Sequence, residues 1–459
     1  MKKKQVLALT LTVAMIASLT ACGAQPTEGT TTAATDAAAT TAAADTTAAT
    51  GDATASSDDK TITFWNMGTD DPDKTLWQMA ADWYNTNESP KSGYTVETVS
   101  TTNDQYKQKL SVAMSAGECP DMYTHWSGGP MIEYINSGYA QDITDLMTSS
   151  GTKDLYIDGA ISQASYNDKI YAVPVLNDSV SVFFYDKKMW ADKGYEVPKT
   201  IADLETLCDK MVADGVTPFA LANSSQWTGS MYYMYLVARS GGASIISDAY
   251  AGTGSLVCDA TEYAGKTIED WVNKGYFPEG VNSLSADDGE DRALLYQGAG
   301  MMLQGSWSVG SIKSENPDFY ENLGCFAFPT LDGSSADQSI VVGTLGDNFI
   351  SFNCTGEKLQ EAFKVAQYYS TQDWEDTAIA DGKVPPLKTA TSEEPAWKDI
   401  LSVLGEASSV QLWWDQYLPS SVADVHKSAS QKLFDVSATP EEVEKEQQDA
   451  LDEYLAENK

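Results

Sequence analysis

The chain has 459 residues, with 29 Lys and Arg against 66 Asp and Glu, and its formal net charge is -37. This acidity argues against a nucleic-acid partner, because binding a phosphate backbone requires a basic surface. The 12 Trp, 23 Tyr and 12 Phe are enough both for packing and for a site that stacks on a flat ligand.

The first 21 residues have the pattern of an export signal. Three lysines, Lys2 to Lys4, precede an apolar stretch from Val6 to Ile16 that is too short to anchor the chain across a bilayer. The following LTACG sequence resembles the lipobox, at which bacteria attach lipid to a cysteine and cleave just before it. We therefore expect a signal peptide over residues 1–21 and lipidation of Cys22. The alternative is an ordinary signal peptide with an incidental cysteine.

Residues 24–59 consist almost entirely of Thr, Ala, Ser, Gly and Asp, without an aromatic residue. Such a segment cannot bury enough apolar surface to form a fold, so residues 22–59 are predicted to be a flexible tether. A coil of this length spans on the order of 30 Å, which is enough to hold a folded body away from a membrane surface. Such a tether is useful only if Cys22 is anchored, so we expect a lipid anchor on the extracellular face of the membrane. No second apolar run of membrane-spanning length follows, so we expect membrane contact only through the lipid.

The body from Lys60 onward alternates between strand and helix patterns and is long enough for two domains. Strands are predicted at Thr61–Trp65, Tyr94–Val99 and Asp121–Thr124, and helical spacing of apolar residues follows Asp71 and Asn103. This order predicts an α/β fold with a mainly parallel sheet and helices on both faces.

Ligands of such sheets bind at loops beyond the carboxyl ends of the strands. Here these loops are Asn66–Asp70 and His125–Gly129, which are polar and aromatic. Neither has the glycine pattern of a phosphate-binding loop, so no nucleotide cofactor is expected. The chain has only two histidines and no cysteine pair with metal-binding spacing, so we expect no transition metal. Two acidic runs are candidate ligands of a hard cation, but neither has the EF-hand spacing, so we expect no metal there and assign them to solvated caps and turns: Asp70, Asp71 and Asp73, and Asp287, Asp288, Glu290 and Asp291.

Six segments in a fixed order resemble extracellular solute-binding proteins of the maltose-binding type, which are sugar receptors of ABC importers. In appearance the sequence is most similar to Gram-positive receptors for raffinose and multiple sugars. The segments are ITFWNMGT (62–69), SAGECPDMY (115–123), NSGYAQDITDLM (136–147), YAVPVLNDSVSVFFYDKKMW (171–190), YQGAGMMLQGSW (296–307) and WWDQYLP (413–419).

This resemblance implies a monomer with the two-lobed fold of periplasmic binding proteins, in which each lobe is a β-sheet flanked by helices and a hinge joins the lobes. The implied first lobe comprises residues 60–177 and 328–371. The second comprises residues 178–327 and 372–459.

A receptor for a pyranose needs aromatic rings against the C–H face of the sugar and planar polar groups against its hydroxyls. The resemblance implies that Trp307, Trp126 and Trp227 stack on sugar, with His125 beside Trp126. We also expect contributions from Trp414 and Asp415. Further partners for hydroxyls are expected at strand ends and crossovers, namely Asn66, Asn177, Asp178, Asp347 and Asn348. Core packing, turns and helix caps are the alternative roles of all these residues.

The favoured function is a receptor, not an enzyme, that captures a short oligosaccharide and delivers it to a membrane permease. A cell-surface glycoside hydrolase is one alternative, because aromatic clefts with paired carboxylates also describe that class. A receptor for a different solute, such as a peptide or a polyamine, is another.

Overall fold

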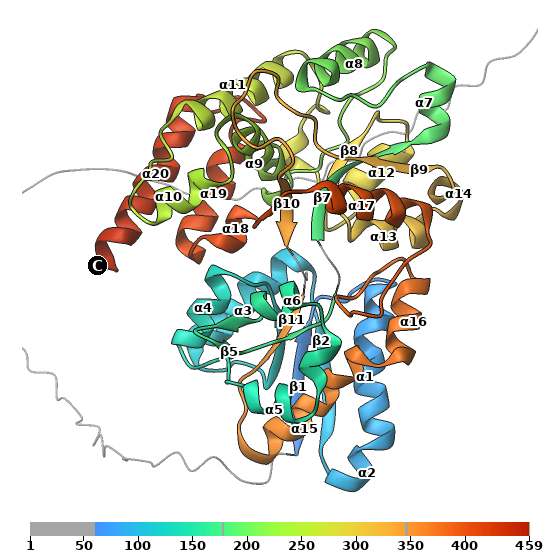
Figure 1. Cartoon of the computed structure of the whole chain (residues 1–459), viewed down its shortest axis with the longest axis vertical. Coiled ribbons are helices and arrows are strands. Elements are labelled where there is room, and N and C mark those ends of the chain that lie inside the picture. Colours follow the sequence, from blue (N-terminus) through green and yellow to red (C-terminus); the bar gives the residue numbers. More distant parts are fainter. Residues whose placement is uncertain (1–59, 177–178, 345–347, 459) are drawn as a thin grey trace, which may run out of the picture. The chain divides into compact units, whose positions relative to one another are not determined.

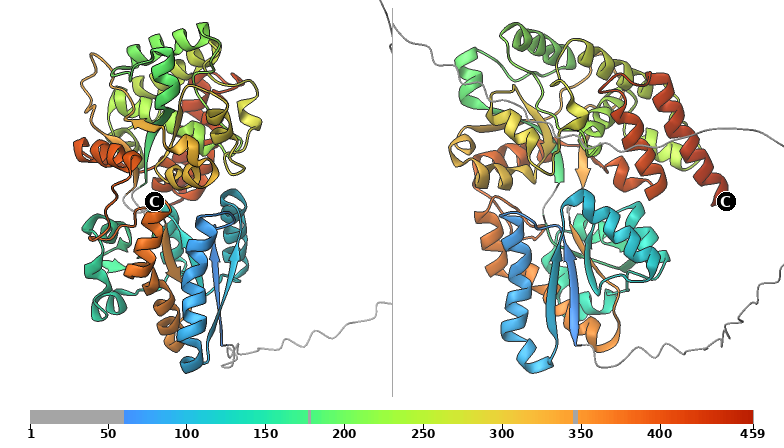
Figure 2. Two further views of the ribbon diagram at one scale, coloured as in Figure 1. Left: turned by 90° about the vertical axis from the view of Figure 1, so that its right-hand side faces the viewer. Right: turned by 180° about the vertical axis from the view of Figure 1, so that it is seen from behind.

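The computed structural model describes residues 60–176, 179–344 and 348–458. The predicted signal peptide, Cys22 and the tether lie outside the described residues, as do Asn177, Asp178 and Asp347. Two five-stranded sheets organise the described chain, each with its own helices (Figures 1 and 2). No helix of the described ranges has both the length and the apolar content needed to cross a membrane.

The first sheet has the strand order β2-β1-β3-β11-β6 and forms the centre of the first lobe. Strand β1 is parallel to β2 and β3, whereas β11 is antiparallel to β3 and β6. The elements of the first lobe are β1 (Thr61–Asn66), α1 (Asp73–Asn87), α2 (Ser89–Ser92), β2 (Thr95–Ser100), α3 (Asn103–Ala116), β3 (Met122–His125), α4 (Gly129–Asn136), α5 (Thr144–Ser149), α6 (Asp158–Gln163), β4 (Ser165–Tyr166), β5 (Lys169–Ile170), β6 (Val173–Pro174), β11 (Phe349–Phe352), α15 (Gly356–Gln367) and α16 (Gln372–Ala380).

The core of the first lobe lies between this sheet and helices α1, α15 and α16. Alternate residues of β1 are buried, including Ile62 and Phe64, as expected for a strand with one covered face. Helix α3 is fixed to the carboxyl ends of two strands, because the Tyr106 hydroxyl donates to Trp65 O (3.2 Å) and to Thr124 O (2.7 Å). These bonds place the N-terminal part of α3 next to the loops that follow β1 and β3.

The second sheet has the order β12-β10-β7-β8, and β9 also pairs with β7. Its elements are β7 (Ser179–Asp186), α7 (Lys187–Lys193), α8 (Ile201–Ala213), α9 (Trp227–Gly241), α10 (Ser244–Tyr250), α11 (Asp259–Asn273), α12 (Glu290–Tyr296), β8 (Met302–Gly305), α13 (Ser308–Glu315), α14 (Pro317–Tyr320), β9 (Leu323–Phe326), β10 (Val341–Thr344), α17 (Pro395–Glu406), β12 (Val410–Gln411), α18 (Trp414–Tyr417), α19 (Ser420–Gln431) and α20 (Pro440–Glu457).

Strand β7 is antiparallel to β8, β9 and β10, so the prediction of a mainly parallel sheet does not hold for this lobe. The prediction came from the β/α alternation at the start of the chain, which describes only the first lobe. The first six residues of β7 are buried, and so are all residues of α9 from Thr228 to Arg239. The second lobe is therefore built around one central strand and one central helix.

The chain changes sheet at a different place from the expected one. Residues 328–371 were assigned to the first lobe, but β10 pairs with β7 of the second sheet, and only β11 belongs to the first. The Arg239 guanidinium holds the segment before β10 on α9, because it donates to Phe328 O (2.9 Å), Pro329 O (2.9 Å) and Ile340 O (2.8 Å).

Helix α16 also differs from the expected assignment, which placed residues 372–459 in the second lobe. Trp374 of α16 is buried in the first core, where its indole lies edge-on to Tyr369 at 5.3 Å and donates to Leu76 O (3.2 Å). Because Trp374 and Ala378 of α16 are both buried in this core, α16 belongs to the first lobe.

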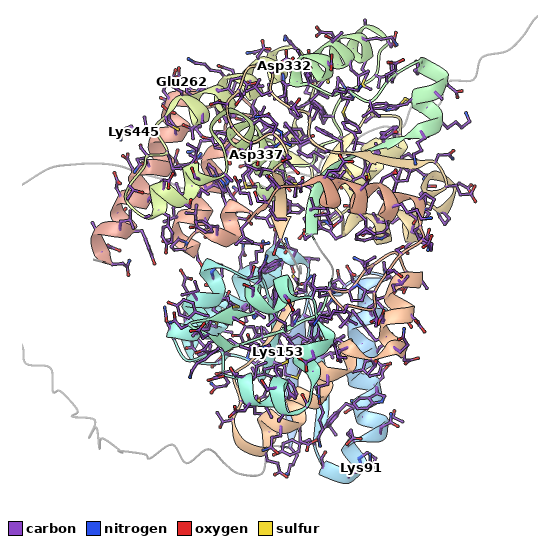
Figure 3. All side chains as sticks on the ribbon, viewed as in Figure 1. Lys91, Lys153, Glu262, Asp332, Asp337 and Lys445 are labelled. Atoms are coloured by element: carbon purple, nitrogen blue, oxygen red, sulfur yellow. The ribbon has the colours of Figure 1, made fainter. Side chains whose placement is uncertain are left out.

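Charged side chains cover the outer surface. Lys91, Asp332 and Lys445 are exposed and lie at the periphery of the ribbon (Figure 3). Most charged side chains are in contact with water, which makes the strong net negative charge compatible with the apolar cores of the two lobes. Buried exceptions such as Arg239 and Asp291 are hydrogen-bonded.

Candidate functional site

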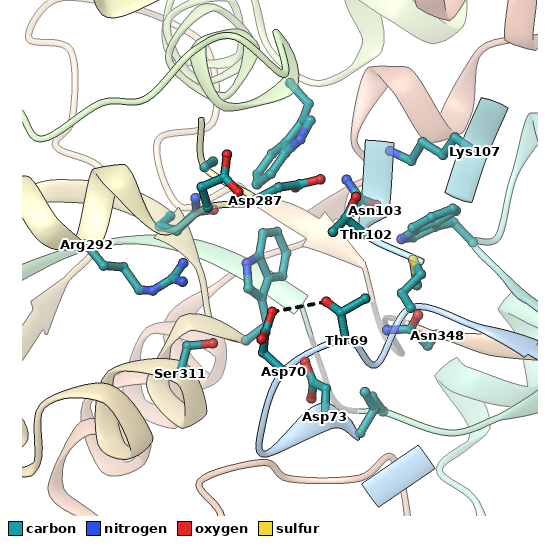
Figure 4. Close-up of a pocket in the computed structure, with 18 of the residues that line it drawn as sticks. Thr69, Asp70, Asp73, Thr102, Asn103, Lys107, Asp287, Arg292, Ser311 and Asn348 are labelled. Atoms are coloured by element: carbon teal, nitrogen blue, oxygen red, sulfur yellow. Dashed lines mark hydrogen bonds between the residues drawn. The ribbon is translucent and has the colours of Figure 1, made fainter. Parts of the chain in front are cut away.

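A cavity of about 570 Å³, called the first cavity here, has walls from both lobes. The first lobe contributes the loop after β1, the N-terminal part of α3 and the residue after β3. The second contributes the start of α9, residues 286–288, the end of β8, the start of α13 and the chain around α18. The expected binding loops of the first lobe thus supply part of the wall (Figure 4).

Three indoles of the second lobe form one contiguous aromatic wall. Trp307 lies 5.9 Å from Trp227 and 6.0 Å from Trp413, measured between ring centres, and all three line the first cavity. Trp307 is the residue before α13, where the chain turns out of β8. Gly305 permits this turn, because a Cβ there would lie 2.1 Å from the Trp307 ring.

Trp126 is the aromatic contribution of the first lobe. It follows β3, and its ring lies edge-on to Tyr106 with 6.5 Å between ring centres. The Lys107 ammonium lies 4.5 Å from the centre of the indole, which is within cation–π range. Burial lowers the pKa of Lys107, and the nearby Asp415 carboxylate opposes that shift.

Two acidic residues of the cavity are held in ion pairs. The Lys383 ammonium, which is almost fully buried, lies 2.9 Å from Asp73 Oδ1 and donates to Trp307 O (3.4 Å). Arg292 donates to Glu315 through Nε (2.9 Å) and Nη2 (2.7 Å). Asp73 and Glu315 are therefore neutralised locally, and Lys383 connects α1 to the backbone that positions Trp307.

Gln304 and Asp287 are held by hydrogen bonds and not by ion pairs. Gln304 Nε2 donates to the buried carboxylate of Asp291 (2.8 Å), which fixes the amide at the end of β8. Asp287 accepts from the backbone N–H of Asp104 (3.0 Å), a contact between the second lobe and α3. Burial raises the pKa of Asp287 above that of an ordinary aspartate. The site thus combines an aromatic wall with fixed hydrogen-bonding groups and with Asp287, a lining carboxyl of raised pKa.

Five predicted site residues line the first cavity, namely Trp307, Trp126, Trp227, Asp415 and Asn348. Trp414 does not, because its ring is fully buried between Tyr233 (6.0 Å) and His426 (5.1 Å). Its neighbour Trp413 lines the cavity instead. The preference for Trp414 was therefore wrong: only one of two adjacent rings at the start of α18 faces the cavity.

His125 and Asn66 also do not line the cavity, and both side chains are buried. His125 Nε2 lies 2.7 Å from Ser351 Oγ and its Nδ1 lies 2.8 Å from Trp126 O, so the ring supports the residue that does face the cavity. Asn66 Oδ1 accepts from Gly68 N (3.0 Å) and from Ser100 Oγ (2.7 Å), which shapes the loop after β1.

Several groups that line the first cavity were not predicted as site residues from the sequence. Asp70, Asp71, Asp73 and Asp287 belong to acidic runs that have the pattern of solvated caps and turns, and Thr69 was inside a predicted loop. Thr69 donates to Asp70 (3.1 Å) at the cavity (Figure 4). Lys383 gives no local signal, since its position depends on packing between segments about 300 residues apart.

The chain belongs to the bacterial extracellular solute-binding proteins, whose family model matches residues 68–376. One relative is the multiple sugar-binding protein of Streptococcus mutans, which is 27% identical over 335 residues, covering 70% of this chain and 73% of that protein.

Solved structures of the same fold are also similar to this chain. One comes from work on xylan utilisation by the thermophilic bacterium Caldanaerobius polysaccharolyticus and has a TM-score of 0.78 at 28% identity, covering 85% of this chain and 99% of that one. Another is a chitin oligosaccharide binding protein, with a TM-score of 0.78 at 22% identity, covering 86% of this chain and 98% of that one. The two-lobed α/β fold of this family is thereby confirmed.

Proposed function

We propose that this protein is the carbohydrate receptor of an ABC importer and that it binds a short oligosaccharide in the first cavity. The observation that supports this most strongly is the aromatic wall of Trp227, Trp307 and Trp413, with Trp126 contributed by the other lobe. Flat apolar rings beside carboxylates and amides match the C–H faces and hydroxyls of pyranoses. Two relatives of this chain also point to sugars, the multiple sugar-binding protein and the structure from work on xylan utilisation.

The proposed receptor is not an enzyme and passes its sugar intact to a membrane permease. In its mature form it is a monomer on the outer face of the membrane, held by lipid on Cys22.

Labelling with a fatty-acid analogue tests the lipid anchor. It should mark the wild-type protein and not Cys22→Ser, and label on the mutant would contradict the anchor.

Calorimetry with a panel of xylo-, malto-, chito- and raffinose-type oligosaccharides tests the proposed ligand class. We expect saturable binding of at least one series and no binding of peptides or polyamines. Binding of a peptide or a polyamine without binding of any sugar would replace the proposed function by that of a receptor for another solute.

The hydrolase alternative has a specific test at Asp287, because a carboxyl of raised pKa in a cavity is what a general acid requires. Long incubation of each bound oligosaccharide with the protein should leave it intact. Cleavage that accompanies the purified wild-type protein and disappears in Asp287→Asn would establish the hydrolase instead.

A further inference from the structure

A second cavity of about 1230 Å³ lies beside the first. The two cavities share four lining residues, Lys107, Trp126, Asp415 and Gln416, so they meet at these side chains. Helices α3 and α4 of the first lobe and α19 with residues 224–226 of the second form the rest of its wall. The proposed site does not use this space.

The junction lies at one end of the first cavity. Lys107 and Arg292 appear on opposite sides of the close-up in Figure 4, and only Lys107 also lines the second cavity. A molecule that extends along the first cavity away from Arg292 therefore reaches Trp126 and then the second cavity.

The lining of the second cavity combines apolar side chains with uncharged polar ones. Hydroxyl and amide side chains come from both lobes, among them Gln108, Ser111, Ser115, Ser224, Ser225 and Ser428. Some of its charged groups are already engaged: Lys427 lies 2.9 Å from Asp424, and the Glu133 carboxylate accepts from Ser420 N (3.1 Å) and Oγ (2.6 Å). Apolar surface beside hydroxyl and amide groups suits a neutral molecule that presents both C–H faces and hydroxyl groups.

Two buried oxygen atoms of the lining have no hydrogen-bond partner among the described residues. They are Ser225 Oγ and Gln416 Oε1. Buried polar atoms are rarely left unpaired, because their desolvation costs about 1–3 kcal/mol each. Hydroxyl groups of a ligand are suitable partners for both atoms.

We infer that the protein binds an oligosaccharide longer than the first cavity holds, and that the chain continues past Trp126 into the second cavity between α3 and α19. This inference rests on the proposed function and adds to it the ligand class, an extended oligosaccharide rather than a mono- or disaccharide enclosed at both ends. Trp126 then contacts a ring near the middle of the bound chain.

The test compares affinities across chain lengths. For xylo- and malto-oligosaccharides of two to six rings, calorimetry should show affinity that still increases when rings are added beyond the shortest member that binds. Ser111 is exposed and lines only the second of the two cavities, so Ser111→Trp should weaken the longest oligomers about fivefold or more and leave the disaccharide nearly unchanged.

Gln105→Trp is the matched control, because Gln105 is an exposed residue of the same helix that lines neither cavity. It should leave the ratio between long and short oligomers unchanged. A gain in affinity confined to long oligomers in Ser111→Trp, from stacking on the new ring, would also support the inference. An unchanged ratio in Ser111→Trp, or equal wild-type affinity at all lengths, would overturn it. Failure of every oligosaccharide to bind would instead overturn the proposed function.

Discussion

Individual tryptophans in this protein have separable roles. Trp307 is partly exposed in the cavity, whereas Trp414 is fully buried in the second core. We expect Trp307→Ala to weaken sugar binding by on the order of 1 kcal/mol, about fivefold, through lost stacking. Trp414→Ala should instead lower the free energy of unfolding by about 3–5 kcal/mol, as for other large buried side chains.

Calorimetry and urea unfolding of both variants check this prediction. Trp307→Phe serves as the control, because it keeps an aromatic face and should recover part of the affinity. A stable Trp307→Ala protein with wild-type affinity for every sugar that binds would contradict the stacking role.

Five lining residues were predicted from the sequence: Trp126, Trp227, Trp307 and Asp415 through the family resemblance, and Asn348 through its place at a crossover. The preference for Trp414 over Trp413 was wrong, because the four-residue helix α18 is too short to show a repeating apolar face that would separate two adjacent rings. The choice depends on α19, whose His426 packs against Trp414 at 5.1 Å.

At the scale of elements, Arg239 of α9 determines where one crossover segment lies. Its guanidinium is buried and donates to three backbone carbonyls. Arg239→Met would leave these carbonyls without their donors, and we expect a loss of on the order of 3 kcal/mol in unfolding free energy. Urea unfolding measures this loss, and Arg239→Lys should recover only part of it, because one ammonium cannot reach all three acceptors. A loss below 1 kcal/mol in Arg239→Met would contradict this role.

The strands and helices at the start of the chain were predictable from their apolar periods. The strands predicted at Thr61–Trp65 and Tyr94–Val99 correspond to β1 and β2, and Gly117 ends α3 in the left-handed conformation. The antiparallel pairs of β7 and the sheet change before β11 were not predictable. Both depend on pairing between segments far apart in the sequence, for which a local pattern gives no information.

For the whole molecule, the two histidines make stability depend on pH. Burial lowers the pKa of both His125 and His426 to about 4, against about 6.5 in an unfolded chain. Between these values the unfolded state binds protons that the folded state does not. Stability should therefore be highest above pH 6.5 and decrease as the pH falls towards 4, by on the order of 3 kcal/mol for each histidine.

Unfolding at pH 7 and pH 5.5 measures this dependence. His426→Gln, which keeps a hydrogen-bonding group near Gln447, should reduce it by about half of the histidine contribution. Equal pH dependence in the wild type and in this variant would show that His426 is not held neutral in the fold.

The lobes must also respond to ligand if both contribute walls to one cavity. A sugar that contacts Trp126 and Trp307 together favours the arrangement of the lobes in which these residues are close. It therefore shifts the population of molecules towards that closed arrangement. Small-angle scattering should show a smaller radius of gyration with saturating sugar, and saturation without any compaction would contradict hinge closure.

The aromatic wall has an optical consequence as well. With ring centres 5.9 and 6.0 Å apart, the electronic transitions of Trp227, Trp307 and Trp413 are coupled, so the three indoles absorb circularly polarised light as a group. The sign and strength of such a signal depend on the angles between the rings, which are 63° and 58° here. A ligand that turns Trp307 by a small angle therefore changes the circular dichroism spectrum, and this protein contains its own spectroscopic reporter of an occupied cavity.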